Sequence, residues 1–173
     1  RDYNMRLDLD KIKEELELVQ NEFYYDDQIC LQGVEDIPDP FFGCGAIKIG
    51  TSPPYGPWKK ETWPGYREKD FTHPNFDLPY TNSILEELNM CRTRVLILKP
   101  KQCYSIHTDR SKRIHIPVVT NKNCWIILNR EVIHLPADGN YYEIDTTQEH
   151  TAVNGSWENR IHLVGAVFDS DKK

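Results

Sequence analysis

Long apolar runs are missing from this sequence of 173 residues: no stretch approaches the roughly 18 consecutive apolar residues that a membrane span requires. We therefore predict no membrane-spanning helix and no membrane partner. The chain begins at Arg1, and no segment has the apolar core of a secretory signal peptide. Internal repeats and low-complexity tracts are also absent from the sequence.

Cysteine pairs with C-x-x-C spacing are missing as well. The five cysteines stand at positions 30, 44, 91, 103 and 124, an odd number with no metal-type spacing. This pattern indicates neither a disulfide framework nor a zinc knuckle. Free thiols fit a reducing compartment best, so the sequence predicts a cytoplasmic protein. We interpret the sequon Asn154-Gly155-Ser156 as a turn.

An excess of positive charge is the third feature that the chain lacks. The formal net charge is −6, and residues 1–40 alone carry 4 Lys and Arg against 12 Asp and Glu. A protein that binds nucleic acid needs a basic face, so no nucleic-acid partner is predicted. The acidic N-terminal part is typical of a solvated helix face.

The length and the helical patterns indicate one domain, residues 1–173, with helices before a β-rich part. A chain of this size buries roughly 70% of its unfolded surface. Apolar residues at spacings of 3, 4 and 3 predict an amphipathic helix over 9–20, started by Asp8 or Asp10 and covering a sheet. The capping-box pattern at Ser83-Ile84-Leu85-Glu86 predicts a second helix over 82–91.

The remaining pattern is that of short strands. We predict two near 28–33 and 45–50, followed by eight that alternate with hairpin-length links. The eight are 93–99, 103–108, 113–119, 124–129, 132–135, 140–144, 149–153 and 160–168. The expected fold is mainly β, a double-stranded β-helix (a cupin-like jelly roll) with its core at about 93–168 and flanking N-terminal helices.

Residues 51–80 form a segment without periodicity. It contains six of the eleven prolines and seven aromatic residues. Long segments without regular structure inside a compact domain are usually functional or disordered, and this one is too aromatic for disorder. Two interpretations stay open: a flap that faces the substrate, or a loop that packs over the edge of the sheet.

Three residues have the chemistry of a metal site. His107 and Asp109 are two apart in a β-prone context, so their side chains project to one side. His150 follows 41 residues later. Two imidazoles and one carboxylate, with the other positions open, make up the facial triad of non-haem Fe(II) oxygenases. We predict these three residues as metal ligands and catalytic residues.

Arg160 adds a fourth functional residue. It lies ten residues after His150, beyond the turn at 154–156, so 149–153 and 160–168 are predicted to pair as antiparallel strands that bring the guanidinium back to His150. H-x-D, a long gap, His, and Arg ten residues later resembles the Fe(II)/2-oxoglutarate oxygenases. HTAVN followed by R-x-H-L resembles their aspartyl/asparaginyl β-hydroxylase-like branch, over about residues 78–168.

The resemblance implies the roles of the remaining residues. Arg160 would pair with the distal carboxylate of the co-substrate 2-oxoglutarate, and the R-x-H pair, Arg113 and His115, would lie near the co-substrate. Relatives without the carboxylate ligand include halogenases, so Asp109 implies hydroxylation. The aspartyl β-hydroxylases proper lack this acid, so an aspartyl substrate does not carry over, whereas amino-acid hydroxylases of the branch that act on proline keep it. His162 shares a face with Arg160 and is a candidate neighbour of the site.

The expected function is therefore a hydroxylase that uses Fe(II), 2-oxoglutarate and dioxygen on a C–H bond of a small molecule or a peptide. Two alternatives remain. The first is a jelly-roll binding module without catalysis, and the second is a cupin metalloenzyme that does not use 2-oxoglutarate. The second alternative would give Arg160 no role.

Overall fold

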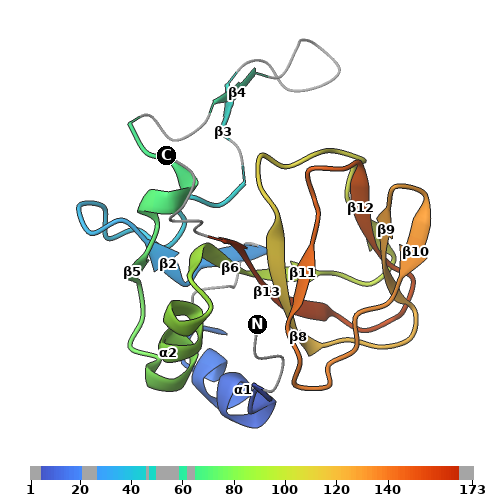
Figure 1. Ribbon diagram of the computed structural model, residues 1–173, viewed down its shortest axis with the longest axis horizontal. Helices are drawn as coiled ribbons and strands as arrows, with labels where there is room; N and C mark the ends of the chain where they lie inside the picture. Colours follow the sequence, from blue (N-terminus) through green and yellow to red (C-terminus); the bar gives the residue numbers. More distant parts are fainter. Residues whose placement is uncertain (1–4, 21–26, 46, 50–58, 62–64, 168–173) are drawn as a thin grey trace.

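The computed structural model describes residues 5–20, 27–45, 47–49, 59–61 and 65–167. Two antiparallel sheets dominate it (Figure 1). The larger has the order β1-β6-β13-β8-β11 and the smaller the order β10-β9-β12-β7. The larger sheet comprises β1 (Gln28–Cys30), β6 (Met90–Leu98), β13 (Arg160–Val167), β8 (Arg113–Val119) and β11 (Tyr142–Ile144). The smaller comprises β10 (Glu131–Ile133), β9 (Cys124–Leu128), β12 (His150–Asn154) and β7 (Gln102–Cys103). The predicted mainly β jelly roll is confirmed.

Two two-stranded sheets lie outside this sandwich. They pair β2 (Gln32–Gly33) with β5 (His73–Pro74), and β3 (Ile47–Ile49) with β4 (Lys59–Glu61). The prediction of strands near 28–33 and 45–50 is thus confirmed, with a break at Leu31 in the first. None of the helices in the described part of the chain has the length and apolar character needed to cross a membrane.

The predicted pairing of 149–153 with 160–168 is wrong, because consecutive strands belong to different sheets. β12 pairs with β9 and β7, whereas β13 pairs with β6 and β8. Both edges of β13 are therefore occupied in the larger sheet. Asn154 stabilises the crossing, since its side-chain amide donates to the carbonyl oxygens of Leu98 at 2.9 Å and Glu158 at 2.7 Å.

Helix α1 (Leu9–Glu17) begins where the sequence predicts and ends three residues earlier. The Asp8 side chain caps it by accepting from the Lys11 amide at 3.2 Å. Its apolar side packs with α2 on the outer face of the larger sheet, as Figure 1 also shows. The expectation that this helix covers a sheet is confirmed.

Helix α2 (Pro79–Glu87) departs more from its prediction, because its cap comes from another helix. The Glu15 carboxylate of α1 accepts from the backbone amides of Tyr80 and Thr81, both at 2.7 Å. The predicted capping box is wrong: the Ser83 hydroxyl lies inside the helix and donates to the Tyr80 carbonyl oxygen at 2.6 Å. Asn89, with φ of 51°, ends the helical path, so 90–91 belong to β6.

The predicted segment 51–80 is only partly described, since 51–58 and 62–64 lie outside the described residues. Its described part is not irregular throughout. It contains β4, the short 3₁₀ helix η2 (Glu68–Asp70), β5 and the start of α2. Phe71 is buried and packs with Phe42 and Tyr66. The choice between a flap and a packing loop stays open for the undescribed residues.

Candidate metal centre

His107 and His150 are brought together by backbone pairing. The two residues form an isolated antiparallel bridge, in which the His107 amide donates to the His150 carbonyl oxygen at 3.1 Å and the reverse bond measures 3.0 Å. Their ring centroids are 4.4 Å apart. The long gap in sequence between the two imidazoles is thus closed by a pair of hydrogen bonds.

Backbone carbonyls fix the orientation of both rings. Nδ1 of His107 lies 2.6 Å from the Ser105 carbonyl oxygen, and Nδ1 of His150 lies 2.9 Å from that of Gln148. Each Nδ1 therefore carries the proton, and each Nε2 has its lone pair free. This arrangement prepares both Nε2 atoms as metal ligands.

Asp109 completes the group. Its carboxylate oxygens lie 3.8 Å from His107 Nε2 and 3.4 Å from His150 Nε2, and the three ligand atoms all fall within 4.8 Å of one another. Burial disfavours the charged carboxylate, but the close contact with His150 and the charge of Arg113 outweigh it and hold the pKa of Asp109 well below its usual value. An ionised carboxylate beside two imidazoles suits a divalent transition metal.

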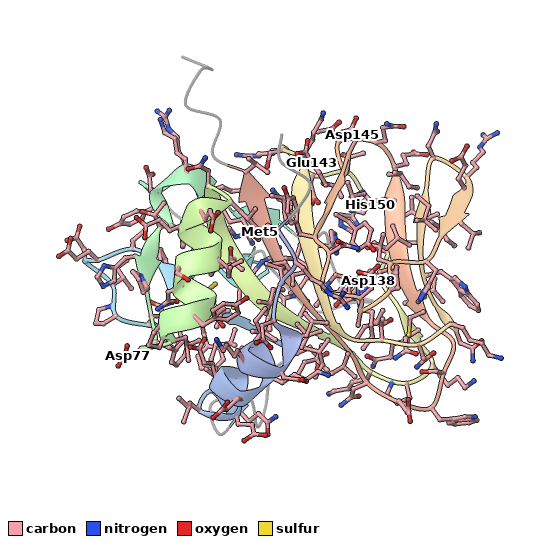
Figure 2. The ribbon with its side chains drawn as sticks, turned by 60° about the horizontal axis from the view of Figure 1, so that its bottom comes forward. Met5, Asp77, Asp138, Glu143, Asp145 and His150 are labelled. Carbon is pink, nitrogen blue, oxygen red and sulfur yellow. The ribbon has the colours of Figure 1, made fainter. Side chains whose placement is uncertain are left out.

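The group opens into a cavity of about 910 Å³ between the two sheets. Figure 2 shows His150 among the side chains of this interior. Alternate residues of β6, β13 and β8 reach the cavity from one side, and β12 and β9 contribute residues from the other. A volume of this size is typical of sites for small ligands.

Arg160 contributes an unpaired buried cation to this cavity. The side chain is 2% exposed, and its Nε and Nη1 atoms have no hydrogen-bond partner among the described residues. The buried Tyr104 hydroxyl, which also lines the cavity, lacks a partner too. Burial lowers the pKa of Arg160, and no carboxylate of the described residues forms an ion pair with it, so a bound anion would stabilise its charge.

Arg113, by contrast, is bound to carboxylates of the protein. It donates to Glu68 of η2 through two hydrogen bonds of 2.7 and 2.8 Å, and its Nε lies 3.4 Å from Asp109. Burial opposes ionisation of Glu68, but Arg113 and then Arg92 shift the balance and lower its pKa. Arg113 therefore lies in the wall of the cavity and connects Asp109 to η2.

His115 and His162 form a buried pair beside Arg160. Their Nδ1 atoms are 3.1 Å apart, so one donates and the other accepts. His115 lines the cavity, and burial together with the charges of Arg160 and Arg113 lowers its pKa to about 3. Burial also lowers the pKa of His162 well below its usual value. Both rings are neutral at physiological pH.

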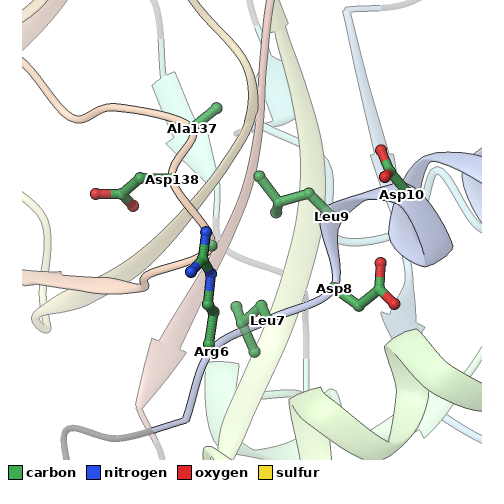
Figure 3. A pocket seen from close by; sticks show the side chains of 8 residues that line it. Arg6, Leu7, Asp8, Leu9, Asp10, Ala137 and Asp138 are labelled. Carbon is green, nitrogen blue, oxygen red and sulfur yellow. The ribbon is translucent and has the colours of Figure 1, made fainter.

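A second hollow, of about 460 Å³, lies where the chain before α1 meets the loop at 137–139. Figure 3 shows Arg6 reaching toward this loop. Two of its three carboxylates already have partners: Asp8 caps α1, and Asp138 accepts from Tyr142 at 2.8 Å. This hollow holds no converging set of metal ligands and is not the candidate site.

The structure places all six sequence-predicted site residues on one cavity. His107, Asp109 and His150 converge, Arg160 and His115 line the wall beside them, and Arg113 supports Asp109. Sequence reasoning missed Glu68, Tyr104 and Arg94. Arg92 and Arg94 gave a signal, since two arginines at period two within an apolar strand indicate one functional face; Glu68 gave none.

The family model described as aspartyl/asparaginyl beta-hydroxylase matches residues 8–169. A comparison with curated proteins gave no match.

Among solved structures, similar chains include a cupin domain from Bordetella pertussis Tohama I and a predicted oxalate decarboxylase from Thermotoga maritima. The first has 13% identity and a TM-score of 0.40 over 45% of this chain and 81% of its own. The second has 12% identity and a TM-score of 0.40 over 50% and 74%. A Photorhabdus luminescens protein has 18% identity and a TM-score of 0.37 over 44% of this chain, which spans 62% of that protein.

Because the family model covers nearly the whole sequence, the chain belongs to the aspartyl/asparaginyl β-hydroxylase family.

Proposed function

We propose that this protein is an Fe(II)- and 2-oxoglutarate-dependent dioxygenase that hydroxylates a C–H bond of an amino acid or a peptide side chain. Membership of the hydroxylase family supports an oxygenase, and the His107, Asp109 and His150 group supports a metal. Residues 1–173 would act as one domain. The observation that carries the proposal is Arg160, a buried guanidinium at the cavity whose Nε and Nη1 atoms have no hydrogen-bond partner among the described residues.

The donor set fits Fe(II). Two neutral imidazoles and one carboxylate leave coordination positions open, and nitrogen and oxygen ligands suit this ion. Iron, when bound, supplies the activation of dioxygen. The protein holds both Nε2 atoms in place through Nδ1 bonds to carbonyl oxygens, and Arg113 keeps Asp109 ionised and oriented.

The cavity also fits a dicarboxylate. One carboxylate of 2-oxoglutarate, with its keto group, suits the open metal positions, and the other suits Arg160. A planar guanidinium pairs with a carboxylate through two parallel hydrogen bonds, and the Tyr104 hydroxyl offers a further donor nearby. The neutral His115 lines the same cavity as Arg160 and the three candidate metal ligands. It would contact the co-substrate as a hydrogen-bond donor or acceptor.

Arg160 variants test the co-substrate. Removing one partner of a desolvated ion pair costs about 2–5 kcal/mol, so Arg160→Ala should raise the apparent constant for 2-oxoglutarate by about 30-fold to a few thousand-fold. Arg160→Lys should fall between, because an ammonium lacks the planar fork. Iron content should stay unchanged. The measurement is a titration of succinate formation on iron-loaded protein, with folding checked by circular dichroism.

An Arg160→Ala protein that is folded, iron-replete and unchanged toward 2-oxoglutarate would contradict the proposal. Iron-dependent activity without succinate formation would instead favour a cupin metalloenzyme. A protein that binds ligands without any turnover would favour a binding module.

Ligand variants test the metal. His107→Ala and His150→Ala should each remove stoichiometric Fe(II) binding, because two remaining ligands hold iron weakly. His73→Ala is the matched control, since His73 is exposed on β5 and should leave iron content unchanged. The readout is metal analysis of purified protein after reconstitution. Full iron and full activity in both ligand variants would show that the three residues do not bind the metal.

A further inference from the structure

The main cavity is far more cationic than the protein. Its lining contains two carboxylates, Glu68 and Asp109, whereas the chain as a whole has net charge −6. The cationic side chains in the lining are Arg67, Lys69, Arg92, Arg94, Arg110, Arg113 and Arg160. Such a lining attracts anions and focuses their approach. The proposed co-substrate pairs with only one of these cations, Arg160. The cavity therefore keeps positive charge that could bind a second anion.

Arg94 lies at a different place along the sheet from Arg160. Arg160 pairs with Leu98 of β6, and Val164 pairs with Arg94, so four residues of strand separate the two positions. At about 3.4 Å per residue this separation is about 14 Å. Both carboxylates of 2-oxoglutarate are already assigned, one to the metal and one to Arg160. None is left for Arg94.

Arg94, unlike the neighbouring arginines Arg92 and Arg113, has no carboxylate partner among the described residues. Arg113 is held by Glu68 through two bonds, and Arg92 donates to the Gly43 carbonyl oxygen at 2.8 Å and lies 3.3 Å from Glu68. Arg94 donates from Nη1 to the Gln28 side-chain oxygen at 3.0 Å, and its buried Nε has no partner among the described residues.

The electrostatic environment strengthens this observation. Burial lowers the pKa of Arg94, and the nearby charge of Arg113 acts in the same direction. No described carboxylate forms an ion pair with Arg94. The charge of a partly buried cation without a counter-charge costs free energy, and an anion bound in the cavity would offset part of that cost. The neutral Gln28 amide orients the guanidinium without neutralising it.

We propose that Arg94 binds a carboxylate of the substrate, so that the substrate class is an amino acid or peptide with a free carboxylate. This inference rests on the proposed function, since it takes Arg160 as the co-substrate site. Arg94 and Leu96 alternate onto the same face of β6 and line the same cavity as the metal ligands. A carboxylate bound at Arg94 would therefore hold its carbon chain in the space that opens toward the metal.

Paired ligands test the inference by direct binding. The probes are the twenty free amino acids, their carboxamides, and tripeptides with free or amidated C-termini, titrated calorimetrically into the protein. At least one carboxylate should bind ten-fold or more tightly than its amide. Preference for a free amino acid over every tripeptide would identify a small-molecule substrate, and the reverse would identify a peptide. If no carboxylate binds better than its amide, the inference is wrong.

Variants then assign the effect to Arg94. Arg94→Ala should weaken the preferred carboxylate about 30-fold or more and abolish the preference over the amide, while Arg94→Lys should retain part of it. The matched control is Lys122→Ala, which removes an exposed cation outside the cavity and should change neither value. Arg94→Gln serves as a second variant if the alanine variant fails to fold by circular dichroism.

Succinate formation without substrate separates this inference from the proposed function. Arg94→Ala should keep its iron and its constant for 2-oxoglutarate within two-fold of the original protein. A rise in that constant equal to the rise for the substrate would place Arg94 in the co-substrate site and overturn the inference. If the protein without substitutions forms no succinate but still binds the carboxylate through Arg94, only the proposed function would be refuted.

Discussion

Arg113 shows how one side chain can support a candidate metal ligand from outside the metal site. Its guanidinium lies between Glu68 and Asp109, and it adds to the effect of His150 in lowering the pKa of Asp109 against the opposing effect of burial. The R-x-H resemblance places Arg113 near the co-substrate. The structure gives it two protein carboxylates as partners, which makes the support of Asp109 its observed contact.

The buried histidine pair predicts how stability depends on pH. The pKa of His115 is about 3 in the folded protein, against 6.5 for a free imidazole. The unfolded chain therefore takes up a proton below about pH 6.5 that the folded protein does not accept. Stability should fall by on the order of a few kcal/mol as the pH drops from about 6.5 toward 3, with no loss above that range.

Urea unfolding at about pH 7.5 and about pH 5 measures this effect. His115→Gln should reduce the difference between the two pH values, because it removes one of the groups that titrate only on unfolding. His73→Gln should keep the full difference, since His73 is exposed on β5. The charged and titratable groups around His115 are Arg160, Arg113, His150, Asp109 and His162, and they are the same in both variants. An equal pH effect in both variants would contradict the prediction.

At this scale the convergence of the three candidate ligands could be predicted from the sequence, but their supporting residues could not. H-x-D is a local pattern that keeps His107 close to Asp109, although the structure has an isolated bridge at His107 and not the predicted strand 103–108. Glu68 precedes Arg113 by 45 residues, in a segment with no periodicity. Its partner depends on how η2 folds against the sheet, which no local pattern encodes.

At the scale of elements, the contact between α1 and α2 predicts a stability effect. Glu15 accepts from the first free amides of α2, which has no side-chain cap of its own. The carboxylate also lies at the positive end of that helix. Glu15→Ala should therefore destabilise the protein by about 1–2 kcal/mol.

The matched control is Glu14→Ala, on the same helix and exposed. It removes the same charge with the same change in helix propensity, and should change the free energy of unfolding by less than about 0.5 kcal/mol. Urea denaturation of the two variants gives the comparison. Equal destabilisation would mean that the cap contributes nothing beyond the general effect of the charge.

The elements also show where prediction from sequence stops. Most strands of the jelly roll and the start of α1 follow from alternation and from Asp8, which are local signals. The predicted strand 103–108 is wrong, because β7 ends at Cys103. The start of α2 does not, because its cap comes from Glu15, 65 residues before Tyr80. The pairing of β12 with β13 was mispredicted because the same turn residues occur in two kinds of connection. A turn can join two strands that pair in one sheet, or it can carry the chain from one sheet to the other, and the sequence of the turn does not distinguish the two.

At the scale of the whole molecule, two opposite fields act on an anionic ligand. The protein has net charge −6, with its acid concentrated in the first 40 residues, whereas the cavity is lined mainly by arginine and lysine. α1 packs on the outer face of the larger sheet, away from the inner face that lines the cavity. The fold thus places the acidic residues of α1 away from the cationic site.

This separation predicts the sign of the salt effect on 2-oxoglutarate turnover. If the local field of the cavity dominates, added salt screens attraction and kcat/KM for 2-oxoglutarate falls; if the net charge dominates, salt screens repulsion and kcat/KM rises. We expect a fall of roughly three- to ten-fold between about 20 mM and about 500 mM NaCl, because the Debye length shrinks to a few ångströms over this range.

The control is a pair of charge-matched double variants. Arg67 and Lys69 are exposed at the cavity, so Arg67→Ala with Lys69→Ala should flatten the salt dependence by removing the outer part of the local field. Lys13→Ala with Lys122→Ala removes two exposed cations outside the cavity and should keep the full dependence. A rise of kcat/KM with salt in the original protein would show that the acidic surface, and not the cavity, governs the approach of the co-substrate.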